Sequence, residues 1–298
     1  MKISGFVTLK NSRQELLPNY SKELPCVMSV AEPDSYSPGG VPWHWHEAVE
    51  LFYIEEGGME FFTPHHSLFF EKGECGIVNS NVLHMTKTYD ICGSRQLLHL
   101  FSPSFIADSS KGRIYEKFVA PVVSSNFEIA RLEGTDFREQ LLNSFAIDEN
   151  ADGYEIRVRN ALSELWLDIK NQLPDDVKID TGNSGDERLK QILVYIYDNY
   201  GEKLSIGNLA KAAFTSQRDV YRLFSQQLHC TPVEFITDYR LQCAYEKLLK
   251  TEESVTDIAQ GCGFNTGSYF GTRFREKYGC TPVECRHRWQ NTDNSWRK

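Results

Sequence analysis

The sequence predicts a two-part α+β protein, in which an N-terminal β-sandwich or small β-barrel with flanking helices is followed by an all-helical C-terminal domain. Short apolar and aromatic runs separated by glycine-containing turns fill residues 41–101. Helical periodicity appears over residues 136–171 and dominates beyond residue 186. A five-residue motif also occurs twice, fifty positions apart, near the C-terminus. With 298 residues, of which 41% are hydrophobic, the chain is long enough for two packed cores.

The predicted strands of the N-terminal part are short and follow one another closely. They include LFYI at 51–54, MEFF at 59–62, SLFF at 67–70 and QLLHLF at 96–101. Short strands divided by turn residues at this spacing are typical of a sandwich or a small barrel. We assign residues 1–135 to this β domain.

Two helices are expected over residues 136–171, because Leu141, Phe145, Leu162 and Trp166 recur at helical spacing. An apolar stripe of this kind most often packs on a core, here the outside of the β domain. The polar stretch 172–186 contains one proline and two glycines. We expect it to be an exposed linker between two domains.

The charge is distributed unevenly along the chain. The net charge is -9, yet residues 186–298 carry 16 Lys+Arg against 14 Asp+Glu, whereas the preceding residues carry 16 against 27. Any contact with a polyanion is therefore expected in the C-terminal part. No apolar run approaches the roughly 18 residues of a membrane span, and MKISGFVTLK lacks a signal-peptide core. We expect a soluble cytoplasmic protein whose eight cysteines are reduced thiols.

The repeated motif is CTPVE, at residues 230–234 and again at 280–284. Thr231 and Thr281 are suited to cap a helix, the following proline occupies a position whose amide is unpaired anyway, and the glutamate closes a capping box. Ser254 with Asp257 offers a similar cap for an earlier helix. Each copy therefore reads as a short helix, a tight turn and a second helix ahead of a capped third, which is a helix-turn-helix layout, at about 205–227 and 254–277.

The second helix of the first copy has two different sides when it is projected at helical spacing. Val220 and Phe224 lie on one side, and Arg218, Tyr221 and Arg222 lie on the other. An arginine on such a face can bond a guanine edge in the major groove, so we favour DNA reading over an ordinary solvated face. In the second copy the corresponding face offers fewer long donors, namely Ser268, Gly271, Thr272 and Arg275.

Residues 188–288 resemble the DNA-binding domain of the AraC/XylS family of bacterial transcription regulators, above all in the stretch SVTDIAQGCGFNTGSYFGTRFREKYGCTPVECR. The resemblance implies a domain over about 187–290 whose two helix-turn-helix units read adjacent major grooves. It places base contacts on Arg218, Tyr221, Arg222, Gly267, Ser268, Tyr269 and Thr272. The family commonly has arginine where this chain has Thr272, a contact that Arg273 would have to replace. Lys211, Arg273 and Arg275 are weaker candidates for phosphate contacts.

The segment HWHEAVELFYIEEG places His44, His46 and Glu50 before Gly57 in the spacing H-x-H-x3-E-x6-G, and His84 follows. This resembles the motif of the cupin β-barrel, the usual sensor half of many members of that family. Residues 44, 46 and 50 share parity along a strand and can face one cavity. We favour a small-molecule pocket completed by Trp43 and Tyr53, over a divalent-metal site and over a purely structural role. A lone strand histidine such as His99 is expected to pack, and His65 and His66 are expected in a turn.

The favoured hypothesis is a non-enzymatic transcription regulator without a cofactor. Its cupin-like domain would sense a small-molecule effector, for which a sugar is the first guess, and modulate binding of promoter DNA in the major groove. The resemblance also implies homodimerisation through residues 136–171 and a possible contact with RNA polymerase, and no membrane partner is expected. The alternative is a metal-dependent cupin enzyme, an oxygenase or isomerase, that carries a DNA-binding tail.

Overall fold

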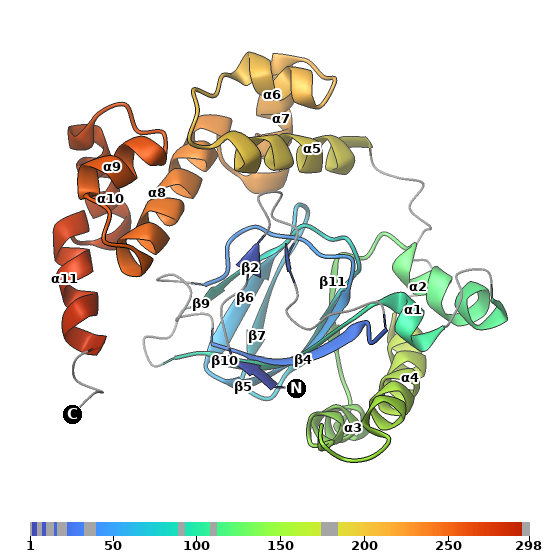
Figure 1. Ribbon diagram of the computed structural model, residues 1–298. Coiled ribbons are helices and arrows are strands. Elements are labelled where there is room, and N and C mark those ends of the chain that lie inside the picture. Colours follow the sequence, from blue (N-terminus) through green and yellow to red (C-terminus); the bar gives the residue numbers. More distant parts are fainter. Residues whose placement is uncertain are drawn as a thin grey trace. The chain divides into compact units, whose positions relative to one another are not determined.

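The computed structural model describes residues 2–4, 8–9, 15–16, 23–32, 40–88, 93–107, 112–173 and 184–293. They belong to two compact units, Met1–Asn183 and Ser184–Lys298 (Figure 1). Most of the predicted linker at 172–186 lies outside the described residues. None of the helices described is both long and apolar enough to cross a lipid bilayer.

The N-terminal unit is built mainly from two sheets. The larger sheet has the strand order β1-β4-β10-β5-β8-β11 and the smaller has the order β7-β6-β9; among the described strands, β2 pairs with β3 alone. The strands are β1 Lys2–Ser4, β2 Thr8–Leu9, β3 Glu15–Leu16, β4 Cys26–Ala31, β5 Val49–Glu56, β6 Gly58–Phe62, β7 Ser67–Glu71, β8 Cys75–Val78, β9 Met85–Thr88, β10 Arg95–Phe101 and β11 Ile129–Leu132. Over the described strands each sheet keeps two free edges, so the pairing does not show the closed barrel that the sequence predicts.

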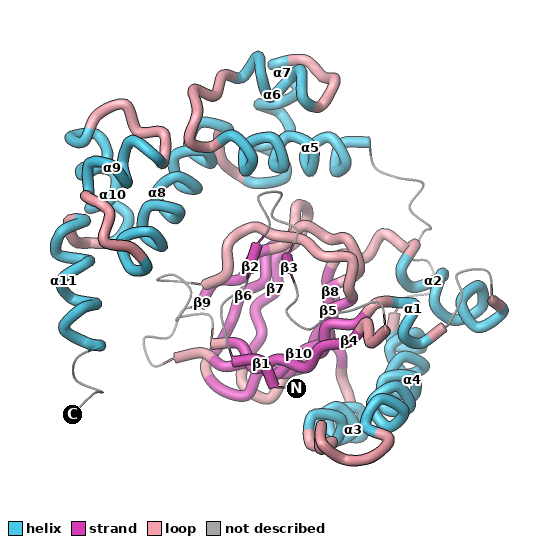
Figure 2. The backbone as a smooth tube through the Cα atoms, viewed as in Figure 1, coloured by secondary structure: helices cyan, strands magenta, loops and turns pink. Residues whose placement is uncertain are grey.

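The helical segments in the described part of the N-terminal unit gather on one side of the strands (Figure 2). They are α1 Pro103–Ile106, the π-helical turn η2 Tyr115–Val119, α2 Ala120–Val123, α3 Thr135–Phe145 and α4 Tyr154–Gln172. The last two form a helical pair where the sequence predicts two helices. The indole of Trp166 on α4 donates a hydrogen bond to the Phe118 carbonyl at 2.9 Å, which fixes α4 against η2.

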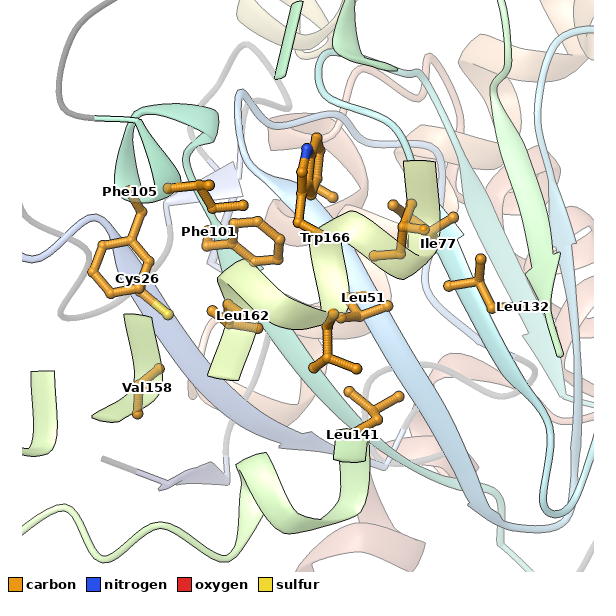
Figure 3. Packing of buried hydrophobic residues seen from close by; sticks show 14 of the residues in the cluster. Cys26, Leu51, Ile77, Phe101, Phe105, Leu132, Leu141, Val158, Leu162 and Trp166 are labelled. Atoms are coloured by element: carbon orange, nitrogen blue, oxygen red, sulfur yellow. The ribbon is translucent and has the colours of Figure 1, made fainter. Parts of the chain in front are cut away.

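Alternation along β5 divides the N-terminal unit into two apolar cores. Leu51 contributes to the core that the helices cover, together with Leu162 and Trp166 (Figure 3). Phe52 points to the other face of the strand and contributes to the core between the two sheets. There its ring stacks on Phe61 of β6 with the ring centroids 4.3 Å apart. A strand whose successive side chains are buried on opposite faces must be covered on both sides, which explains its apolar run LFYI at 51–54.

The C-terminal unit is entirely helical over the residues described. Its helices are α5 Ser184–Asn199, α6 Ile206–Ala212, α7 Gln217–Leu223, the π-helical turn η3 Phe224–Leu228, α8 Pro232–Lys250, α9 Val255–Gly261, α10 Gly267–Tyr278 and α11 Pro282–Asp293. The two short helix pairs, α6 with α7 and α9 with α10, fall within the predicted repeats. The first pair differs from expectation in one respect. The π-helical turn η3 replaces the last turn of a regular α-helix and is followed by His229 in a left-handed conformation, with φ 53°.

The helix starts agree with the capping residues read from the sequence. Thr231 accepts from the Glu234 amide at 3.2 Å while Glu234 accepts from the Thr231 amide at 2.7 Å, so the capping box is complete. Thr281 and Glu284 repeat both bonds, at 3.2 and 2.8 Å. Ser254 caps α9 through the Asp257 amide at 3.0 Å. These local bonds fix where the repeated helices begin.

Helix α8 belongs to both halves of the C-terminal unit. Near its start, the Phe235 ring meets Phe224 with centroids 5.5 Å apart, in the core of the first half. Further along, Leu241 and Leu248 are buried in the core that contains Phe270 and Phe274 of α10. The two helix-turn-helix units are therefore joined by one continuous, packed helix.

Candidate nucleic-acid interface and histidine cluster

Helix α7 has a buried side and a solvent side. Ser216 caps its first turn by accepting from the Asp219 amide at 3.1 Å. Val220 and Phe224 are fully buried, whereas Arg218, Tyr221 and Arg222 are exposed. The apolar residues hold the helix on the unit, and the long donors remain free of that packing. Such a face can present a guanidinium to a base edge in the major groove.

The guanidinium of Arg222 is partly ordered along its own helix. Its Nε lies 3.2 Å from Asp219 Oδ1, and one terminal nitrogen donates to Gln226 Oε1 at 3.3 Å. Hydrogen bonds from Ser216 and then from Arg222 hold the pKa of the Asp219 carboxyl below its usual range. Arg222 must exchange these partners to reach a base, but an exposed ion pair of this kind opposes the exchange only weakly.

The solvent side of α10 carries shorter side chains. Gly267, Ser268, Tyr269 and Thr272 are exposed, opposite the buried Phe270 and Phe274. The Thr272 hydroxyl donates to the Ser268 carbonyl at 3.0 Å, which uses its proton within the helix. Thr272 can therefore offer DNA an acceptor and a methyl group more readily than a donor.

Arg273 lies beside that face of α10 and not at its centre. It is partly buried, and one terminal nitrogen lies 2.7 Å from Glu276 Oε2. One turn further, Lys277 donates to the Asp238 carbonyl of α8 at 3.2 Å, so this edge of α10 adjoins the connecting helix. Arg273 is thus poorly placed to replace the guanine contact that Thr272 lacks. The phosphate candidates Lys211 and Arg275 are both exposed.

The two helix-turn-helix turns have the same hydrogen bonds but different side chains. The Phe214 amide donates to the Lys211 carbonyl and the Thr215 amide to Ala210; the Gly263 and Phe264 amides bond Gln260 and Ala259 in the same way. Phe214 adopts φ 48° and is 91% exposed, whereas Gly263 adopts φ 78°. The sequence alone predicts a tight turn in each unit but does not single out Phe214. Comparing the two turns does so, because glycine is the usual residue at positive φ.

In the N-terminal unit, four residues named from the motif spacing converge between the sheets. His44 and His84 form an isolated β-bridge with reciprocal 2.9 Å hydrogen bonds, while His46 and Glu50 flank the start of β5. The three histidines are 4%, 2% and 1% exposed and Glu50 is 5% exposed. One ring nitrogen of each histidine lies within 4.8 Å of those of the other two. These residues, His44, His46, Glu50 and His84, are called the histidine cluster below.

The carboxylate of Glu50 faces two of the imidazoles. Its Oε2 is 3.4 Å from His46 Nε2 and 3.3 Å from His84 Nε2. Burial by itself raises the pKa of Glu50, but the adjacent imidazoles of His46 and His84 outweigh it and hold that pKa well below the usual range. Burial, reinforced by the neighbouring His84 and His46, lowers the pKa of His44. The cluster therefore combines a carboxylate with at least one neutral imidazole at neutral pH.

Other residues considered from the sequence lie elsewhere. Tyr53 packs against the core beneath the helices, on the opposite face of β5 from Glu50, so its expected place in the pocket is wrong. Trp43, which precedes His44 in the sequence, is partly buried. His99 is fully buried, bonds Ser144 through Nε2 at 2.8 Å and stacks on Phe145, as expected for a packing role. His65 lies 2.6 Å from Glu128 in the turn between β6 and β7.

Comparison with known proteins shows that this chain is similar to transcriptional regulators. Residues 209–288 match the family model described as "Helix-turn-helix domain". An uncharacterized HTH-type transcriptional regulator of Bacillus subtilis is 26% identical over 94% of this chain and 98% of its own length. An HTH-type transcriptional activator RhaS of Pectobacterium carotovorum is 32% identical over 50% of this chain and 53% of its own.

Among solved structures, ToxT from Vibrio cholerae matches with a TM-score of 0.50 at 12% identity, over 88% of this chain and 98% of that one. At this identity the likeness concerns the fold alone. It extends over both units, so the arrangement of N-terminal sheets followed by C-terminal helices is shared with that protein.

Proposed function

The chain is a transcriptional regulator of the AraC/XylS type with a helix-turn-helix DNA-binding domain, and from this premise we propose that it binds promoter DNA by placing α7 and α10 in successive major grooves. The relatives are named regulators, which points to a non-enzymatic protein and away from a cupin enzyme with a DNA-binding tail. The proposed DNA-binding domain spans residues 187–290. Its place of action would be the cytoplasm, where promoter DNA lies.

The observation that carries the DNA proposal is the solvent face of α7. Arg218, Tyr221 and Arg222 are exposed while Val220 and Phe224 are buried behind them, so the helix can enter a groove without losing its packing. Arginine bonds guanine bidentately, and tyrosine adds apolar and hydroxyl contacts. We assign most of the base discrimination to α7, and phosphate, shape and small contacts to Gly267, Ser268, Tyr269 and Thr272 of α10.

A footprint of the full chain on a duplex selected from a random-sequence library tests this assignment. Two protected segments about one helical turn apart, on one face of the duplex, are expected. Arg218→Glu should abolish protection under α7, whereas Arg113→Glu, at an exposed arginine of the N-terminal unit outside the proposed dimerisation segment, should leave both segments intact. A single segment, or uniform coating of the selected and random duplexes alike, would contradict the proposal.

For the N-terminal unit we propose effector sensing at the histidine cluster, within a domain of residues 1–135 of cupin-like type. Support comes from the burial of four ionisable groups between two sheets, since such groups are expensive to bury without a function or a partner. Trp43 stays a candidate for the wall of this site. An effector can change promoter binding only if it binds two conformers of the protein with different affinities.

We also propose that the chain works as a homodimer through the α3 and α4 pair, in the segment 136–171. Ile156 and Leu167 are exposed on α4 and lie on the same side of the helix at helical spacing. Sedimentation of the full chain tests this: Ile156→Glu with Leu167→Glu should convert a dimer to a monomer, and a monomeric unaltered chain would refute it. A contact with RNA polymerase is compatible with a relative named as an activator.

A further inference from the structure

We propose that the histidine cluster binds a divalent transition-metal ion, and that this ion is the small ligand, or part of the ligand, of the N-terminal unit. The inference names the ligand class for the sensing site proposed above and rests on that function only for its regulatory meaning. The first step concerns protons. Nδ1 of His44, His46 and His84 lies 2.8, 2.8 and 2.9 Å from the carbonyls of Pro42, Ala48 and Val82. A carbonyl can only accept, so each Nδ1 carries the proton and donates it.

The second step concerns what remains on each ring. In a neutral imidazole whose Nδ1 is protonated, Nε2 holds a lone pair. Nε2 of His46 and Nε2 of His84 are buried and make no hydrogen bond, although the Glu50 carboxylate lies 3.3–3.4 Å away. Two buried acceptors therefore face a buried anion at short distance. A cation bound by all three groups satisfies the imidazole lone pairs and the carboxylate together.

The third step is the support around the rings. Histidines that bind metals almost always donate their other ring N–H to a backbone carbonyl, a carboxylate or water, which fixes ring orientation and tautomer. All three histidines of the cluster do so. Ligands at ~2.1 Å from one ion are at most ~4.2 Å apart, so the 4.8 Å limit requires only a slight closure of the rings. Imidazoles with one carboxylate suit zinc, nickel, cobalt or ferrous iron and are a poor set for magnesium or calcium.

Metal titration of the full chain tests the proposal without any DNA. Chelator-treated protein is titrated with cobalt(II) and zinc(II), and binding is followed by the visible absorption of cobalt and by elemental analysis after gel filtration. We expect one equivalent per chain, and at least a tenfold loss of affinity in His46→Asn, His84→Asn and Glu50→Gln. His66→Asn removes an exposed histidine from the turn between β6 and β7 and should bind as the unaltered chain does.

Absence of stoichiometric binding, or equal binding by all variants, would overturn the metal proposal. If a histidine variant fails to fold, Glu50→Gln, which keeps the size of the side chain, decides between the outcomes. A cluster held by a proton shared with Glu50 would bind no cobalt. Because this readout does not involve DNA, its failure leaves promoter binding untouched, and a failed footprint leaves the metal result standing.

A second inference comes from the asymmetry between the two turns of the C-terminal unit. We infer that Phe214 contacts an apolar group of DNA, a thymine methyl in the groove that α7 enters, and so contributes to sequence preference; this too rests on the DNA-binding function. Phe214 lies two residues before Ser216, the cap of α7. Recognition helices contact base edges through their N-terminal residues, so the ring is at the end of the helix that approaches DNA.

Folding alone gives no reason for phenylalanine at this position. The side chain is almost fully exposed, and the positive φ disfavours any residue with a Cβ atom. In the second unit the equivalent Gly263 is required by packing, because a Cβ there would lie 2.6 Å from the Tyr200 carbonyl oxygen and 2.8 Å from Arg240. The first turn has space for a side chain and carries a large apolar one. The thymine methyl is the apolar group that a base pair presents in the major groove.

Two measurements on Phe214→Gly test this inference, its melting temperature and its affinity for DNA, and they are expected to change in opposite directions. Phe214→Gly should raise the melting temperature of the full chain by about 2–4 °C, because the strain is relieved. It should weaken binding to the selected duplex by about five- to tenfold. In the unaltered chain, replacing one thymine of the α7 half-site by deoxyuridine should cost a similar factor, and the same replacement should cost nothing further in Phe214→Gly.

Equal DNA affinity of the glycine variant would overturn the inference, as would a loss that no deoxyuridine position reproduces. A fall in melting temperature together with the loss of binding would assign Phe214 to folding. If the unaltered chain selects no duplex, the proposed DNA-binding function is wrong. If it selects a duplex that Phe214→Gly binds equally well, only the Phe214 contact is wrong.

Discussion

Replacement of Arg222 by alanine examines the DNA-binding face most directly. A bidentate arginine–guanine contact contributes ~1–3 kcal/mol to discrimination. In the free protein the guanidinium already bonds Asp219 at 3.2 Å and Gln226 at 3.3 Å, and binding DNA breaks both contacts. The net loss is therefore expected in the lower part of that range, ~1–2 kcal/mol, or about 5- to 30-fold in affinity for the specific duplex.

Fluorescence anisotropy with labelled specific and random duplexes, repeated at several salt concentrations, measures this loss. Arg222→Ala should weaken specific binding, leave random binding nearly unchanged and keep the dependence of affinity on salt. Lys211→Ala, at an exposed candidate phosphate contact, should instead weaken both duplexes and reduce the salt slope by about one. Arg113→Ala, outside the DNA-binding domain and the proposed dimerisation segment, is the control for the loss of an exposed arginine. An equal loss on both duplexes, with a smaller salt slope, would reassign Arg222 to phosphate and refute the groove argument.

Three further predictions concern the stability of the fold. Burial lowers the pKa of His99 to about 3 from an ordinary value of 6.5, so between these values the unfolded chain binds one proton more than the native chain and stability falls as the pH drops. Between pH 8 and 5.5, the free energy of unfolding in urea should therefore fall by about 1.4 kcal/mol less in His99→Gln than in the unaltered chain. Equal falls in the two proteins would contradict this. Leu162→Ala, in the core beneath the helices, should cost about 2–5 kcal/mol of unfolding free energy, whereas the exposed Asn160→Ala on the same helix should change it by less than about 0.5 kcal/mol. Gly263→Ala should destabilise the fold by about 1–3 kcal/mol, because the new Cβ meets the Tyr200 carbonyl at positive φ. Gly271→Ala, inside α10 with open space around it, should stabilise the fold by about 0.5–1 kcal/mol. Thermal unfolding that ranks the two variants in the other order would refute this account of the turn.

Local signals account for much of the C-terminal unit. Thr231 with Glu234 fixes a helix start through bonds between residues three apart, and such bonds can be read directly from sequence. The buried and exposed sides of α7 also follow from helical spacing alone. The π-helical turn at Phe224–Leu228 could not be predicted, because its extra residue per turn depends on how Leu228 and its neighbours pack against the rest of the unit.

The histidine cluster shows where sequence reasoning becomes insufficient. Shared parity suggested that His44, His46 and Glu50 face one way, but the convergence of His84 depends on a bridge between residues forty positions apart. Tyr53 was expected in the same pocket, but it sits three residues from Glu50 and so occupies the opposite face of the strand. The division of the strands into a larger and a smaller sheet is likewise a long-range outcome, set by which strands pair and not by the composition of any one of them.

Because α8 contributes buried residues to both halves of the C-terminal unit, its number of residues sets the angle between the two groove-facing helices. Adding one residue in its middle would turn everything beyond the insertion by ~100° and advance it by ~1.5 Å. The second helix-turn-helix would then meet a different side of the duplex. During divergence, therefore, substitutions along the solvent side of this helix are tolerated far more easily than a change in its length, and the distance between the two half-sites on DNA is inherited with it.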